Sequence, residues 1–60
     1  MSAFSMREFM KRGLLGAVGT QAEYQIIQSA KEWIKKGVLE SSDLEEMQAA
    51  IDALKASGEN

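Results

Sequence analysis

The chain contains no cysteine, no histidine and no proline. Without cysteine no disulfide can form, and without cysteine or histidine a zinc site would need carboxylates alone, which make a poor structural site. The same absences remove the most common catalytic base and the strongest side-chain nucleophile. Apolar runs are short, so no segment is expected to span a bilayer. We therefore expect a protein that is not an enzyme and uses neither a cofactor nor a metal.

The remaining composition is that of a small globular domain. The chain has 60 residues, of which 45% are hydrophobic, too many for a typical disordered protein. We expect one domain over residues 1–60, near the lower size limit for independent folding, stabilised by helix packing or by association. No signal-peptide pattern is present, which together with the lack of cysteine predicts a cytoplasmic location.

Charge is distributed unevenly along the chain, although the net charge is only −2. Residues 1–36 carry six basic and three acidic side chains, whereas residues 37–60 carry one basic and six acidic side chains. Such a division can mark a binding surface, but charges of these signs also stabilise helix ends.

The first predicted helix spans residues 5–12. Ser5 and Glu8 have the spacing of a capping box, and Phe4 and Phe9 that of a hydrophobic staple. Met6, Phe9 and Met10 form its apolar stripe.

Residues 13–19 are predicted to form a glycine-rich loop. Its three glycines do not match phosphate-binding fingerprints, and its other residues are apolar. A solvated linker would be polar, so we expect this loop to be buried against a helix or a partner.

The second predicted helix spans residues 20–36, with Thr20 and Glu23 spaced as a capping box and Gly37 as the stop. One helical face of this segment is apolar and consists of Ile26, Ile27, Ala30, Trp33 and Ile34.

The third predicted helix spans residues 42–56 and is capped by Ser41 or Ser42, of which Ser42 has the capping-box spacing to Glu45. Four apolar residues form its seam: Leu44, Met47, Ile51 and Leu54. The short connection predicts an antiparallel hairpin of the second and third helices. The expected fold is therefore an all-α three-helix unit, with the first helix packed across the hairpin and Trp33 and Met47 in the core.

Function is predicted chiefly by elimination. Asp43, Glu45 and Glu46 lie in a first helical turn, where carboxylates offset the helix dipole, so they do not indicate catalysis. Two short basic stripes exist, Arg7 with Lys11 and Lys31 with Lys35, but the acidic third helix makes a nucleic-acid partner or a small DNA-binding regulator unlikely. The apolar and basic residues of the N-terminal segment leave a peripheral membrane anchor as an alternative.

We therefore expect a non-catalytic module for protein–protein interaction, assembly or self-association. The residues predicted to bind a partner are apolar or aromatic: Tyr24, Leu14, Leu15, Val18, Phe4 and Met6.

Residues 33–47, read as WIKKGVLESSDLEEM, resemble part of the short proteins encoded beside tail and baseplate genes in phages and prophages of Gram-positive bacteria. In those proteins a helix ends in an aromatic-x-x-x-Gly pattern, a small apolar pair follows, and an acidic capped helix begins. The resemblance covers about a quarter of the chain and implies a virion-associated or assembly accessory protein.

Overall fold

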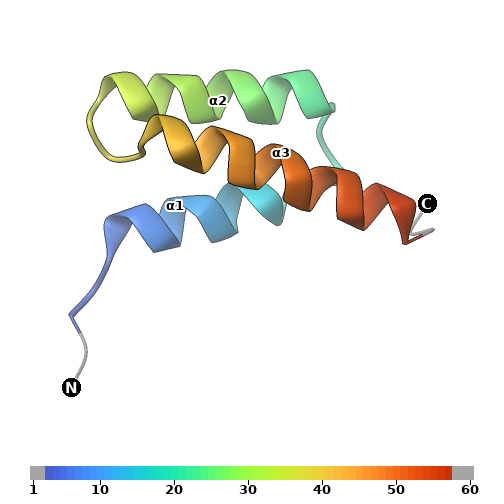
Figure 1. Cartoon of the computed structure of the whole chain (residues 1–60), viewed down its shortest axis with the longest axis horizontal. Helices are drawn as coiled ribbons and strands as arrows, with labels where there is room; N and C mark the ends of the chain where they lie inside the picture. Colours follow the sequence, from blue (N-terminus) through green and yellow to red (C-terminus); the bar gives the residue numbers. More distant parts are fainter. Residues whose placement is uncertain (1–2, 58–60) are drawn as a thin grey trace.

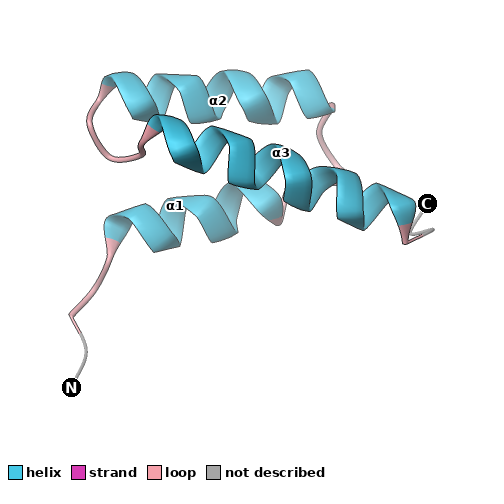
Figure 2. Ribbon diagram, viewed as in Figure 1, coloured by secondary structure: helices cyan, strands magenta, loops and turns pink. Residues whose placement is uncertain are grey.

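The computed structural model describes residues 3–57, which form three helices: α1 (Met6–Leu15), α2 (Glu23–Lys35) and α3 (Ser41–Ala56). All three helices pack against one another. Figure 1 shows that α1 and α3 run in the same direction and that α2 runs opposite to both. Loops are confined to the connections and ends, as Figure 2 shows. The expected all-α three-helix unit, with α2 and α3 as an antiparallel hairpin, is confirmed.

The described helices include none that is both long and apolar enough to cross a membrane. Between α1 and α2, a single isolated bridge joins Val18 to Gln21.

The core is built mainly from α2, α3 and the turn between them. Its buried apolar side chains are Ile26, Ala30, Leu39, Met47 and Ile51. Met47 is completely buried, as expected. Trp33 is only partly buried: it packs against this cluster, while the Lys36 Nζ lies 4.6 Å from the centroid of its ring. The prediction that Trp33 is a core residue is therefore correct only in part: the side chain packs at the edge of the core.

Helix α1 is longer than predicted, because it continues through Gly13 and ends at Leu15 rather than at residue 12. An interior glycine costs a helix about 1 kcal/mol relative to alanine, whereas burial of a leucine side chain contributes about 1.5–3 kcal/mol. Leu14 and Leu15 both pack against the core cluster, and this offsets the cost of Gly13. The predicted loop over residues 13–19 is therefore wrong, and the connection spans residues 16–22.

At the start of α1, the Ser5 half of the predicted capping box is present, and so is the predicted staple. The Ser5 hydroxyl accepts a hydrogen bond from the Glu8 amide at 3.2 Å. The rings of Phe4 and Phe9 lie 5.6 Å apart between centroids, which confirms the hydrophobic staple. The predicted stripe, however, is divided: Met10 packs against the core, whereas Met6 and Phe9 are exposed.

The capping boxes predicted for the other two helices do not form. Thr20 donates its hydroxyl proton to the Ala17 carbonyl, and α2 begins three residues later, where the Ala22 amide donates to the Gln25 side chain. Helix α3 begins at Ser41, and the Glu40 amide donates to Asp43 Oδ2 at 2.8 Å. Neither helix therefore has an N-cap residue that the sequence predicted: Ala22 precedes α2 and Glu40 precedes α3.

Candidate functional site

Asp43 is a buried carboxylate between α1 and α3. Its two oxygens accept hydrogen bonds at 2.8 Å from Nε and Nη2 of Arg7. Lys11 Nζ lies 3.1 Å from Oδ1, and the Glu40 amide donates to Oδ2. No surface of the Asp43 side chain is exposed to solvent. One carboxylate thus caps α3 and attaches α1 to it.

Arg7 and Lys11 are also paired with exposed acids. Lys11 Nζ lies 3.0 Å from a carboxylate oxygen of Glu46, and Arg7 lies 3.7 Å from Glu40. The hydrogen bonds from Arg7 hold the pKa of Asp43 well below its usual range, although burial acts in the opposite direction. Hydrogen bonds to Glu46 and Asp43 raise the pKa of Lys11. Arg7 and Lys11 therefore do not form the free basic stripe that the sequence suggested.

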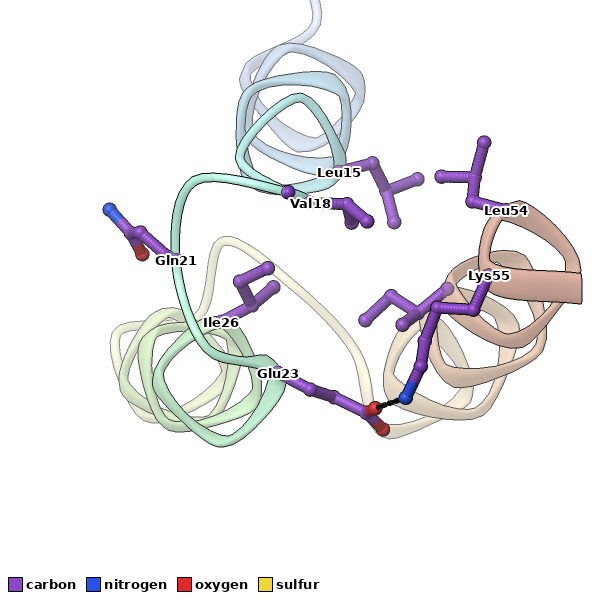
Figure 3. Close-up of a pocket in the computed structure, with 9 residues that line it drawn as sticks. Leu15, Val18, Gln21, Glu23, Ile26, Leu54 and Lys55 are labelled. Atoms are coloured by element: carbon purple, nitrogen blue, oxygen red, sulfur yellow. Dashed lines mark hydrogen bonds and ion pairs between the residues drawn. The ribbon is translucent and has the colours of Figure 1, made fainter. Parts of the chain in front are cut away.

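At the opposite end of the molecule, the ends of the three helices surround a hollow of about 450 Å³. We call it the end hollow. Figure 3 shows Leu15, Val18 and Ile26 directed into it, with Leu54 beside Leu15 at its edge. The residues that line it are Leu15, Val18, Gly19, Gln21, Glu23, Ile26, Ile51, Leu54 and Lys55. Its floor and walls are thus largely aliphatic.

The charged groups of the end hollow neutralise each other. Lys55 Nζ donates to Glu23 Oε1 at 2.9 Å, the contact drawn as a dashed line in Figure 3, and Gln48 donates to the other oxygen. The hydrogen bond from Lys55, supported by that from Gln48, lowers the pKa of Glu23. A ligand in the end hollow would therefore contact mainly aliphatic side chains.

Further apolar surface lies on the beginning of α1 and on α2. The exposed fractions are 72% for Phe4, 46% for Met6 and 58% for Phe9. Tyr24 is 68% exposed, beside a second, more polar hollow lined by Gln21, Gln25, Gln28 and Ser29.

The six residues predicted to bind a partner lie in separate places. Leu15 and Val18 line the end hollow, whereas Leu14 only packs against the core. Phe4 and Met6 are at the other end of α1, and Tyr24 is on the first turn of α2.

The sequence did not indicate that Glu23, Ile51, Leu54 and Lys55 line one hollow with Leu15 and Val18. The available signal was Leu54, the last residue in the apolar seam of α3.

No protein-family model, curated protein or solved structure matches the chain, so its own residues carry the proposals below.

Proposed function

We propose that the chain is a non-catalytic interaction or assembly module that binds an apolar side chain of another polypeptide in the end hollow. The observation that carries this proposal is a hollow of about 450 Å³ whose inward-directed side chains are aliphatic. This volume lies in the range of about 300–1,000 Å³ that is usual for binding sites.

A polypeptide suits the end hollow, because an apolar side chain can contact its aliphatic walls while the polar main chain contacts Gln21, Glu23 and Lys55. An amphipathic helix could insert one leucine, methionine or phenylalanine against Leu15, Val18 and Leu54, as in helix-in-groove recognition. Leu54 is 41% exposed, so its outer half would gain burial from such a contact. Glu23 and Lys55 at the rim can exchange their mutual contact for polar groups of the partner.

A random peptide library selected on the full chain would test the proposal. We expect enriched peptides to share one large apolar anchor and to shift the methyl NMR signals of Leu15, Val18 and Leu54. Leu54→Glu should weaken binding at least tenfold, because it places a charge in the apolar wall. Tyr24→Ala is the matched control and should bind unchanged. Selected peptides that leave these methyl signals in place would contradict the proposal.

A peripheral membrane anchor, the competing function for the N-terminal segment, gains less support from the contacts. Arg7 and Lys11, two of the three cations in that segment, are engaged by Asp43. Flotation with phosphatidylserine-containing liposomes tests this alternative.

The sequence resemblance extends the proposal to virion assembly. Tail or baseplate genes beside the coding sequence would support a role as a phage accessory protein.

A further inference from the structure

One face of α1 is turned away from the rest of the fold. Met6, Phe9, Gly13 and Gly16 follow one another at spacings of three, four and three residues, which is the spacing of a coiled-coil seam. All four are exposed, and Phe4 extends this face by packing against Phe9. We call these five residues the outer α1 face.

The fold itself does not require glycine at position 13. Positive φ angles among the described residues occur at Gly19 and Gly37, and not at Gly13. A Cβ atom added to Gly13 would meet no other atom within 4 Å. Glycine weakens a helix relative to alanine, so the isolated chain gains nothing from it. The missing side chain does allow another helix to approach α1 closely.

We propose that the outer α1 face docks on the same face of a second copy of the chain, with the two α1 helices antiparallel. Phe9 of each copy then lies over Gly13 of the other, and Met6 lies over Gly16. These contacts are compatible with two-fold symmetry, because residues 6 and 16 are equally distant from position 11, and so are residues 9 and 13. A two-fold axis through that position places a large side chain against a glycine at every contact.

The charges at the edge of this face fit the antiparallel orientation. Arg12 is exposed and follows Glu8 by one helical turn. In the antiparallel pair, Glu8 of the second copy lies about 3 Å further along the axis from Arg12, by the rise per residue of an α-helix. A parallel pair would instead place phenylalanine against phenylalanine and glycine against glycine, and would hold the Glu8 and Arg12 side chains of the two copies on opposite sides of the dimer. The distribution of charge and side-chain size thus favours the antiparallel dimer.

The apolar area is sufficient for a weak dimer. Aromatic side chains bury about 150–250 Å² each, so Phe4, Phe9 and Met6 of two copies, at their exposed fractions, bury on the order of 700 Å² together. The flanking residues bring the interface to about 1,000 Å², the lower limit for a specific complex. We therefore expect a reversible dimer rather than an obligate one.

Sedimentation equilibrium of the full chain over a thousandfold concentration range, from about 1 µM to 1 mM, tests the proposal. We expect a reversible monomer–dimer equilibrium that Phe9→Ala and Gly13→Leu each weaken at least tenfold. Gly13→Leu should at the same time increase helicity, so its loss of dimer cannot result from unfolding. Tyr24→Ala removes a similarly exposed aromatic side chain from α2, outside the outer α1 face, and should leave the dissociation constant of the dimer within about twofold.

A charge exchange tests the orientation. Glu8→Arg and Arg12→Glu should each weaken self-association, whereas an equimolar mixture of the two variants should form heterodimers, because every contact between the copies then joins opposite charges. A chain that stays monomeric at 1 mM, or a dimer that Phe9→Ala leaves intact, would overturn the proposal.

Two further experiments distinguish dimerisation through the outer α1 face from membrane binding and from peptide binding in the end hollow. Binding of a monomeric chain to phosphatidylserine vesicles that is lost in Phe9→Ala would overturn the proposal in favour of a lipid surface. Leu54→Glu, which tests the end hollow, should leave the dimer unchanged. The dimer and the proposed function can therefore fail independently.

Discussion

Asp43 is the residue that connects local and tertiary structure. Its carboxylate accepts hydrogen bonds from the amide at the start of α3 and from Arg7, 36 positions away in the sequence. Desolvation of such charges offsets much of their attraction, so the ion pairs contribute chiefly to the position of α1 on α3. Removal of one partner, by contrast, should destabilise the fold, because the remaining charges stay desolvated without an opposite charge.

We expect Asp43→Asn to lower the melting temperature more than any other single acid-to-amide substitution on α3. Asparagine keeps the size of the side chain but removes the charge that faces Arg7 and Lys11. Glu46→Gln is the matched control, since Glu46 contacts the same lysine but is largely exposed. Thermal unfolding followed by circular dichroism gives the comparison. Equal melting temperatures for the two variants would show that the buried carboxylate has no special role.

Met47 allows a test of the core at the same scale. Its side chain is fully buried in the centre of α3, so Met47→Ala should reduce the free energy of unfolding by about 2–5 kcal/mol. For a domain of this size the loss approaches the whole stability. Leu54→Ala, at a site that is 41% exposed, should cost clearly less. Urea unfolding would measure both, and similar values would contradict the assigned core.

At the scale of the helices, the sequence predicted which elements exist better than where they begin. The apolar faces of α2 and α3 were readable because each repeats within one segment. The helix starts were not, because several residues compete for each cap. Ser42 and Glu45 have the spacing of a capping box. The carboxylate that caps α3 is nevertheless that of Asp43, which accepts hydrogen bonds from the Glu40 amide and from Arg7. The use of Asp43 as the capping side chain depends on its contact with Arg7 of α1, and residue spacing within α3 cannot reveal that contact.

Two glycines should respond in opposite ways to alanine. Gly13 has an ordinary helical conformation and open space, so Gly13→Ala should stabilise the monomer by about 0.5–1 kcal/mol. Gly37 has a φ of +85° in the turn after α2, so Gly37→Ala should destabilise it by about 1–2 kcal/mol. Chemical denaturation in dilute solution, where the proposed dimer dissociates, provides the test. Changes of the same sign would contradict the assigned backbone conformations.

At the scale of the whole molecule, the two ends differ in chemistry. The parallel course of α1 and α3 brings Arg7 and Lys11 to the first turn of α3, and it brings Leu15 close to Leu54 at the other end. The sequence identified Leu15 and Val18 as unusual apolar residues, because glycines interrupt the helical pattern around them. It did not identify the end hollow, since its walls come from three segments that only the tertiary fold brings together.

The polar end should control the response of the whole fold to acid. The pKa of Asp43 is lowered in the folded chain, so the unfolded chain binds this proton more readily. The stability that Asp43 contributes is complete above its ordinary pKa of 3.8 and is lost as the pH falls below that value toward the folded pKa. Lys11, whose pKa is raised, contributes stability that is lost only in the alkaline range, above 10.5. The difference in urea midpoint between the wild type and Asp43→Asn should therefore be constant from pH 5 to pH 7 and shrink toward pH 2. Parallel midpoint curves down to pH 2 would show that Asp43 is not the acid-sensitive contact between α1 and α3.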